Sequence, residues 1–374
     1  MASMREPPTV GVEEEFLLIG ADNQPVAANR EVADKAQARG VALQLELTSC
    51  QVETTTRAAT NSGELRDELL RLRSVTAEAA AACDTRLLAV GVPPHVPHEF
   101  PVTDTPRYRR IADNFGMLAH EQGVCGCHVH VAVPDREAAL QVSNRLRPWL
   151  PLLLAVSANS AIYRNANSGY ASWRRILWER WPTAGPPPYF DSVDEYDDTV
   201  RMLVDTGTVL DDAMIYWDVR PSAKYPTIEV RVTDVPSTVT ETVLIATLIR
   251  AAVMTALDET RRGEPALRVP AEVLRAAYSK AAHDGLDGQA IDLGGGRRLI
   301  PTRQLLINFV DHIAPALNSL GEHEWVRSQV ARLSVEGNGA IHQLRAWQIY
   351  GDAADVIADA ERATLSLDFS RKPL

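Results

Sequence analysis

The amino-acid sequence predicts an α+β fold, built on a mainly antiparallel sheet with helices covering one face. Six stretches alternate apolar and polar residues with the period of a strand, and they lie near residues 9–19, 43–55, 87–92, 126–133, 216–220 and 227–235. Long stretches of helical periodicity separate these strands, but without the regular spacing of βαβ units. This combination favours a mixed, largely antiparallel sheet and leaves its second face to be explained.

The helical stretches can be followed along the chain. Asn61 or Ser62 can cap the first long helix, which continues to residue 84. Further helical patterns occupy residues 135–163 and 237–259, and several short helices follow from residue 302. The segment "DLGGGRR", residues 292–298, predicts a tight turn between two short strands.

Composition and length limit the class of protein. No Gly/Ser-rich or Pro-rich linker, repeat or low-complexity tract divides the 374 residues, so we expect a single domain over residues 1–374 with a helical C-terminal region. The formal net charge of −11, without a basic cluster, argues against nucleic acid as a partner. Apolar helical surface near residues 243–257 and in the C-terminal region would allow a homodimer, although a buried core explains it equally well.

The sequence also predicts a cytoplasmic protein with no membrane partner. The N-terminal "MASMREPPTV" has no apolar signal segment, and the most apolar helical stretch, residues 149–163, is too short and too polar to span a bilayer. Four cysteines are too few and too unevenly placed for a disulfide framework in a chain of this size. A reducing compartment fits this pattern.

The stretch "GVEEEFLLIG" places three glutamates in the middle of a predicted strand. Because alternate residues of a strand share a face, Glu13 and Glu15 point to one side, whereas Glu14 points to the side of Val12 and Phe16. We therefore expect Glu14 to lie on the helix-covered side with a partner of its own, such as an arginine, or at a strand edge that meets water.

The same alternation gives three other strands one apolar and one polar face. Their polar positions are Gln51, Glu53 and Thr55; His128 and His130; and Thr227, Glu229, Arg231 and Thr233. A solvated face would explain any one of these strands. Together, however, they gather carboxylates, and like charges facing one another across strands are destabilising, which points to a compensating divalent cation.

Hard carboxylate oxygens with one or two imidazoles suit Mg²⁺ or Mn²⁺ better than zinc. Cys125 and Cys127 do not change this preference, since in an unbroken strand they face away from the histidines. Mg²⁺ held by a few carboxylates typically completes its shell with water and nucleotide phosphates, which suggests ATP chemistry, although the chain has no P-loop motif. Glu46 lies seven positions before Glu53 and reaches the same face only if "LTSC" bends the chain.

Five segments resemble the carboxylate–amine ligases of the glutamate–cysteine ligase type 2 family. In order, they are "GVEEEFLL", "ELTSCQVETTT", "GCHVHVAV", "SWRRILWERWPTAGPPPYF" and "WDVRPSAKYPTIEVRVTDV". The resemblance covers most of the chain, from about residue 10 to residue 348. It implies a glutamine-synthetase-like fold with an open metal- and ATP-binding face, and a single catalytic ligase domain.

The resemblance also implies an ATP-dependent reaction that forms an amide through an acyl-phosphate and releases ADP and phosphate. Glutamate is the acid and cysteine the amine that it implies, with ATP and Mg²⁺ or Mn²⁺ as cofactors. By motif position, the implied metal ligands are Glu13, Glu15, Glu46, Glu53, His128 and Glu229. Arg231 is the implied phosphate contact, and Ser172 and Arg174 match a Ser-x-Arg segment. The resemblance therefore implies that Ser172 contacts the nucleotide together with Arg231, and it makes Arg174 a candidate for a substrate carboxylate or a phosphate.

One position departs from the family pattern. The segment "EGNGAIHQLR" has His342 where the family often has an arginine before Gln343. Two alternatives to the ligase stay open from the sequence. One is a phosphotransferase on the same fold, and the other, for which this departure is the only motive, is a nucleotide-binding protein without turnover.

Overall fold

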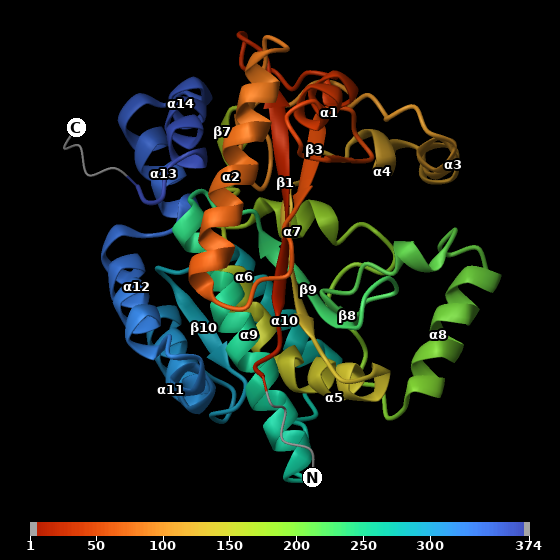
Figure 1. Ribbon diagram of the computed structural model, residues 1–374, viewed down its shortest axis with the longest axis vertical. Helices are drawn as coiled ribbons and strands as arrows, with labels where there is room; N and C mark the ends of the chain where they lie inside the picture. Colours follow the sequence, from red (N-terminus) through yellow and green to blue (C-terminus); the bar gives the residue numbers. More distant parts are fainter. Residues whose placement is uncertain (1–5, 370–374) are drawn as a thin grey trace.

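The computed structural model describes residues 6–369 and confirms the α+β class (Figure 1). Its main sheet has seven strands in the order β2-β3-β1-β5-β9-β8, with β4 paired to the far end of β1, and every pairing is antiparallel. These strands are β1 (Val10–Ile19), β2 (Gln44–Leu45), β3 (Gln51–Thr55), β4 (Arg86–Leu88), β5 (Gly126–Ala132), β8 (Val219–Pro221) and β9 (Thr227–Asp234).

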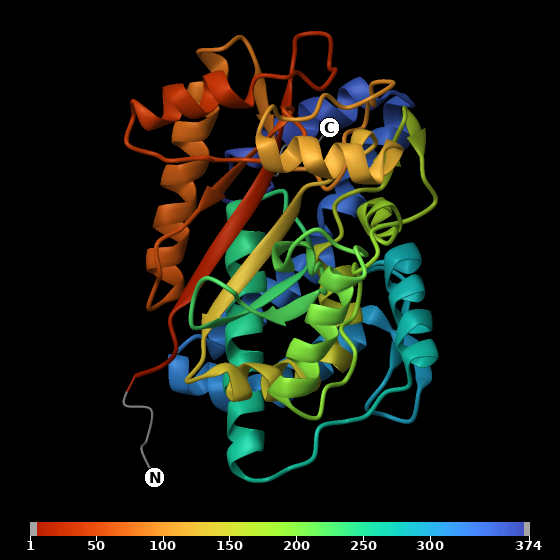
Figure 2. The ribbon, with the colours of Figure 1, turned by 90° about the vertical axis from the view of Figure 1, so that its right-hand side faces the viewer.

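Four helices cover one face of this sheet: α2 (Ser62–Ala81), α5 (Arg136–Leu146), α6 (Leu150–Ser157) and α9 (Val239–Arg261). Figure 2 shows β1 and β5 crossing the molecule side by side, with α2 on one flank and the long α9 behind them. Val12, Val129 and Val230 point into this layer and are fully buried, as the alternation in the sequence predicts.

Helix α9 is the centre of that layer. It begins with a capping box, in which the Thr238 hydroxyl accepts from the Glu241 backbone N–H and the Glu241 carboxylate accepts from the Thr238 backbone N–H. By length and composition α9 could cross a membrane. The sequence interpretation chose residues 149–163 as the most apolar helical stretch and so missed the apolar character of α9. However, 83% of its apolar window is buried inside the fold. It is a core helix, so residues 243–257 offer no free face to a second subunit.

The remaining helices lie around this centre. They are α1 (Asn29–Gln37), α3 (Pro106–Phe115), α4 (Met117–His120), α7 (Trp173–Trp178), α8 (Val193–Asp205), α10 (Ala271–Asp284), α11 (Thr302–Leu320), α12 (His323–Glu336), α13 (Gly339–Tyr350) and α14 (Ala353–Thr364). In Figure 1, α11 to α14 lie on one side of β1, and α3, α4 and α8 lie on the other. The second face of the sheet is therefore partly enclosed, because α3 and α8 lie beside it.

Several predicted elements are confirmed with shorter bounds. The strand expected over residues 216–220 begins only at Val219, and the one expected over 87–92 ends at Leu88. The pattern over 135–163 divides into α5, a 3-10 turn (Arg147–Trp149) and α6. Asn61 is the N-cap of α2, and "DLGGGRR" is the turn of the hairpin β10 (Gln289–Asp292) and β11 (Arg298–Pro301).

The alternation fails at one point in β9. Cys127 of β5 pairs with Thr233, but Val129 pairs with Val230. Two residues of β9, Arg231 and Val232, therefore stand opposite a single residue of β5, His128. Beyond this bulge the faces of β9 are exchanged. Thr233, which the sequence placed on the polar face, points to the apolar side, and Asp234 takes its place.

Candidate active site

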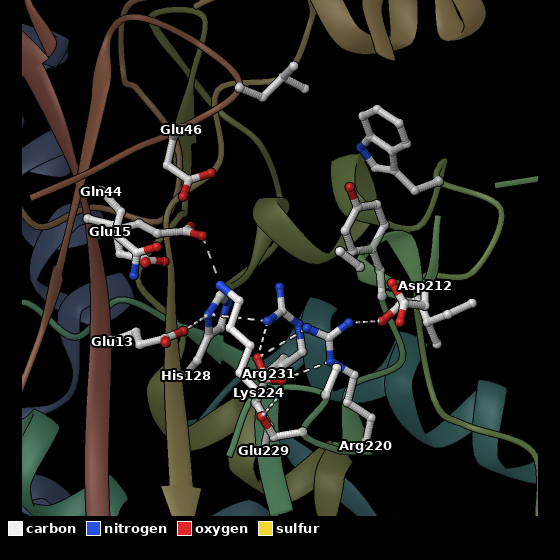
Figure 3. Close-up of a pocket in the computed structure, with 18 of the residues that line it drawn as sticks. Glu13, Glu15, Gln44, Glu46, His128, Asp212, Arg220, Lys224, Glu229 and Arg231 are labelled. Atoms are coloured by element: carbon white, nitrogen blue, oxygen red, sulfur yellow. Dashed lines mark hydrogen bonds and ion pairs between the residues drawn. The ribbon is translucent and has the colours of Figure 1, made fainter. Parts of the chain in front are cut away.

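Strand register brings the predicted acidic side chains together. Glu15 stands opposite Glu53 across β1 and β3, and Glu13 stands opposite His128 across β1 and β5. His128 Nδ1 lies 3.3 Å from Glu13 Oε2, and its Nε2 lies 3.8 Å from Glu15 Oε1. Figure 3 shows Glu13, Glu15 and His128 converging from β1 and β5.

A second histidine extends this cluster. His130 stands opposite Glu229 across β5 and β9, and its Nε2 lies 3.5 Å from Glu13 Oε1 and 3.9 Å from Glu229 Oε1. The sequence placed His130 on this face but gave it no role. Its position between two carboxylates adds it to the candidate ligands.

Three groups of side chains have the spacing of a metal site. In each group, one ligand atom from every residue lies within 4.8 Å of the others. The groups are Glu13, His130 and Glu229; Glu13, Glu53 and His128; and Glu15, Glu46 and Glu53. Glu13 and Glu53 each belong to two groups, so the three form one continuous cluster.

Glu46 reaches the cluster because the chain turns directly after β2. Ser49 N–H donates to Pro101 O at 2.8 Å, and the Thr48 hydroxyl accepts from Cys50 N–H at 3.3 Å, which fixes the bend expected in "LTSC". Burial and the charge of Glu15 raise the pKa of Glu46 to about 8. Burial and the charge of Glu46 likewise raise the pKa of Glu53 well above its usual range.

Glu229 differs from the other four carboxylates. Arg231 contacts its Oε1, and Arg220 Nε donates to its Oε2 at 2.8 Å (Figure 3). Burial opposes ionisation of Glu229, but these two guanidinium groups hold its pKa well below the usual range. The sequence interpretation missed Arg220. Its only signal in the sequence is that it lies two positions after Asp218, on the same face of the strand predicted over residues 216–220.

The charges of this face do not balance. Within residues 6–369, no lysine or arginine forms an ion pair with Glu13, Glu15, Glu46 or Glu53. Carboxylates at this density, in partial burial, require a cation or their own protonation. Oxygen donors with two imidazoles fit Mg²⁺ or Mn²⁺, whereas Cys125 and Cys127 are buried and belong to none of the three groups, and Cys125 Sγ accepts from Gln51 Nε2 at 2.8 Å.

Arg174 approaches the cluster from α7. Its side chain is 3% exposed, its Nε has no partner, and Gly126 lies directly beneath its guanidinium, which has room only because that position lacks a side chain. It lines the same cleft as the carboxylates. Arg174 is thus a buried cation directed into the cleft rather than a surface arginine.

Ser172 does not reach the cleft. Its hydroxyl is fully buried, donates to Asp234 Oδ1 at 2.9 Å, and caps α7 by accepting from Arg175 N–H at 3.4 Å. The expectation that Ser172 contacts the nucleotide finds no support in this geometry. The residue instead fixes the start of the helix that carries Arg174.

The cleft over the cluster has a volume of about 630 Å³. Its floor is the polar face of the sheet, and its wall is apolar and aromatic, with Tyr108 from α3, Trp178 from α7 and Tyr216 from the segment before β8. Lys224, in the loop between β8 and β9, adds a cation at the rim (Figure 3). A polar floor and a largely apolar wall are typical of a ligand site.

His342 lies away from this cleft. It belongs to α13, where its ring stacks on Phe369 with centroids 3.5 Å apart. The departure from the family pattern at this position therefore does not alter the cleft directly. The neighbouring Gln343 is buried and bonds Asn159 and Ala161, which makes it part of the framework behind the site.

Comparisons with known proteins agree with this geometry. Residues 9–359 match the family model described as glutamate–cysteine ligase family 2. A protein of Mycolicibacterium smegmatis, provisionally named glutamate–cysteine ligase 2-3, is 60% identical over 364 residues, which cover 97% of this chain and 100% of the relative. A similarly named protein of Nocardia farcinica is 58% identical, over 96% of this chain and 94% of the relative.

Solved structures share the fold at low identity. The glutamate–cysteine ligase of Francisella tularensis, determined with AMP, superposes with a TM-score of 0.69 at 13% identity, over 98% of this chain and 91% of that one. A bifunctional glutathione synthetase of Pasteurella multocida gives a TM-score of 0.68 at 14% identity, over 96% of this chain and 52% of that one. At such identities the likeness concerns the fold alone.

Proposed function

This chain belongs to the glutamate–cysteine ligase family 2, and from that membership we propose that it joins glutamate to the amino group of cysteine. It is an ATP-dependent carboxylate–amine ligase. The proposal adds the two substrates, the divalent cation and the role of each residue. The observation that supports it most is the convergence of four carboxylates without a basic partner beside two arginines in one cleft.

We assign the cation ligands to Glu13, Glu15, Glu46, Glu53, His128 and Glu229, and add His130 to them. When bound there, Mg²⁺ or Mn²⁺ would neutralise the ATP phosphates and polarise the transferred phosphoryl group.

The arginines supply the remaining positive charge. Arg231 lies at the junction of the cluster and the cleft, where its planar guanidinium can bind the oxygens of the transferred phosphoryl group. Arg174, which lines the same cleft, binds a carboxylate of the acid. The apolar wall around Tyr108, Trp178 and Tyr216 limits the access of water, which would otherwise hydrolyse an activated acid.

The reaction then needs no protein nucleophile. A carboxylate oxygen of the acid bonds to the γ-phosphorus of ATP, and ADP leaves with the electron pair of the broken bond. The amine nitrogen next bonds to the acyl carbon of the resulting acyl-phosphate, phosphate leaves, and the nitrogen loses a proton. Alignment of the reacting groups by the two arginines and the cluster provides much of the rate.

The direct test is ADP and phosphate release by the purified protein with Mg²⁺, ATP and a panel of acids and amines. We expect release that requires both an acid and an amine, with glutamate and cysteine as the best pair. Hydroxylamine should trap the acyl-phosphate when the amine is omitted. A stable phosphorylated product that accumulates instead would favour a phosphotransferase, and ATP binding without consumption would contradict catalysis altogether.

The residue assignment has its own test. Glu13→Gln and Glu229→Gln should each lower ADP release by about 100-fold or more, since even partners of metal ligands typically contribute 10- to 100-fold. Glu31→Gln, an exposed carboxylate on α1, is the matched control and should leave the rate unchanged. Full activity in both cluster variants, with intact folds, would refute the assignment.

We further propose that the chain acts as one catalytic unit in a reducing cytoplasm. All four cysteines are free, and three of them are buried in the cores. The helical C-terminal region supports the site through Gln343, whose side-chain amide bonds the backbone of the segment before α7.

A further inference from the structure

A buried carboxylate lies just outside the cluster and has no part in the chemistry described above. Asp234 is the last residue of β9 and is 0% exposed. It reaches the side of the cleft only because the bulge at Arg231 and Val232 exchanges the faces of β9. A carboxylate buried at this depth needs hydrogen bonds or an opposite charge to offset the free-energy cost of its burial.

Three hydrogen bonds fix the Asp234 carboxylate. Its Oδ2 accepts from Asn159 N–H at 2.9 Å and from the Ser160 hydroxyl at 2.7 Å, and its Oδ1 accepts from the Ser172 hydroxyl at 2.9 Å. All three donors belong to the segment that leads from α6 into α7. The carboxylate therefore has a single, rigid orientation.

The cation that faces this carboxylate is Arg174. Its Nη1 lies 3.9 Å from Asp234 Oδ1, and among the described residues its guanidinium makes no hydrogen bond to another side chain or carbonyl. The arginine is 3% exposed, so its charge is shielded from solvent, and its Cζ also lies 5.9 Å from the centroid of the Trp178 ring, a cation–π contact. Asp234 is the nearest balancing charge, yet it leaves the donors of Arg174 free for a ligand.

Two glycines shape the space around this pair. A side chain at Gly91 would meet Asp234 Oδ2 at 2.8 Å, and a side chain at Gly126 would collide with the Arg174 guanidinium. Asp234 and Arg174 are thus each packed directly against backbone. The position of the guanidinium depends on these contacts together with the field of the carboxylate.

We propose that Asp234 is a positioning residue for catalysis, which holds the Arg174 guanidinium in the cleft so that its free donors receive the carboxylate of the acid substrate. The inference rests on the proposed function, in which Arg174 binds the acid. A purely structural clamp, tying the end of β9 to the segment before α7, would use the same three hydrogen bonds. The two roles differ in whether Asp234 acts through Arg174.

The test is a double-mutant cycle with glutamate, cysteine and ATP. Asp234→Asn keeps the shape but removes the charge, and we expect it to raise the KM for glutamate about tenfold while the KM for ATP changes less than about twofold. In an Arg174→Gln background the same substitution should have little further effect on the KM for glutamate, because its partner is gone. Asn61→Ala, which removes the N-cap of α2 on the helix-covered side of the sheet, is the structural control and should lower the melting temperature but leave the KM for glutamate within about twofold.

The result that overturns the proposal is an equal rise in the KM for glutamate in both backgrounds, or a rise shared equally by ATP. Should Asp234→Asn fail to fold, Gly91→Ala, whose added methyl group would meet Asp234 Oδ2 at 2.8 Å, displaces the same carboxylate and must then give the glutamate-specific rise. A crystal structure of the variant used gives a readout without turnover, in which Arg174 should leave its place above position 126; an unmoved Arg174 contradicts the proposal. Failure of the proposed function is distinct, since wild-type protein would then release no ADP with any acid.

Discussion

Neighbouring glutamates on the two faces of β1 have opposite charge environments. On the helix-covered face, Glu14 forms a bidentate ion pair with Arg73, with Nη2–Oε1 and Nε–Oε2 distances of 2.6 and 2.9 Å, and it also accepts from the Thr242 hydroxyl at 2.7 Å. Arg73 donates its remaining hydrogens to backbone carbonyls of Pro236, Ser237 and Thr364. The charges of Glu14 and Arg73 are thus matched inside the protein.

On the cleft face, Glu13 and Glu15 have no such arginine. Among residues 6–369, they lie with Glu46 and Glu53 in a group whose ion-pair partners are histidines, while Arg231 is already bound to Glu229. The difference between the faces separates a structural carboxylate from a ligand-binding one. A carboxylate that the fold needs carries its own counter-ion, whereas one that binds a cation is left without it.

The largest expected effect on stability comes from removing the Glu14–Arg73 ion pair on the helix-covered face. Glu14→Gln leaves the Arg73 guanidinium buried without its charge partner, and it should lower the free energy of unfolding by about 3–5 kcal/mol in urea denaturation. The paired variant Glu14→Leu with Arg73→Met removes both charges and should lose much less. Unchanged stability in Glu14→Gln would mean that this face does not depend on the ion pair.

The second effect concerns pH on the cleft face in protein freed of divalent cations. Burial and Glu15 raise the pKa of Glu46 to about 8, so the folded chain holds this proton more tightly than the unfolded chain. The associated stability is complete below the unfolded pKa and is lost as pH rises toward 8. We expect wild-type protein to lose about 2 kcal/mol relative to Glu46→Gln between pH 5 and pH 8, a value reduced for the partial exposure of this side chain.

Divalent cations should remove that pH dependence, because they replace the proton as the compensating charge. Parallel stability–pH curves for wild type and Glu46→Gln without cations would show that Glu46 does not carry the raised pKa.

The smallest effect tests a single hydrogen bond on the matched face. Thr242→Val removes the hydroxyl that donates to Glu14 Oε1 and should cost about 1.5 kcal/mol in unfolding free energy, without changing ADP release. Thr255→Val on the same helix is the control, since that hydroxyl bonds only the Ala251 carbonyl. A loss of ADP release in Thr242→Val would show that contacts on the helix-covered face affect the cleft face.

Local geometry explains which parts of this site the sequence predicts. The alternation of an unbroken strand is a property of the backbone, so the separation of Glu14 from Glu13 and Glu15 follows from the sequence. Of the two alternatives left open for Glu14, the structure shows the arginine partner, Arg73. The same reasoning fails beyond the bulge in β9. Val232 and Thr233 both favour strands, so no residue marks the bulge, and Thr233 was assigned to the wrong face.

Long-range contacts account for the rest. Glu46 joins the cluster because Thr48 and Ser49 bond to Pro101, more than fifty positions away in the chain. Arg220 meets Glu229 through the register of β8 and β9, and Ser172 turns inward because Asp234 accepts its hydroxyl. None of these pairings has a signature within one segment, which is why Arg220 was missed and Ser172 was expected to contact the nucleotide.

The central claim is that the unmatched carboxylates of β1 and its neighbours hold divalent cations. Titration of the purified protein with Mn²⁺, followed by electron paramagnetic resonance of the free ion, tests it without any substrate. Glu13 belongs to two of the three groups, so Glu13→Gln should weaken Mn²⁺ binding at least about tenfold, whereas Thr242→Val on the opposite face should bind as wild type does. Equal Mn²⁺ binding by wild type and Glu13→Gln would contradict the account.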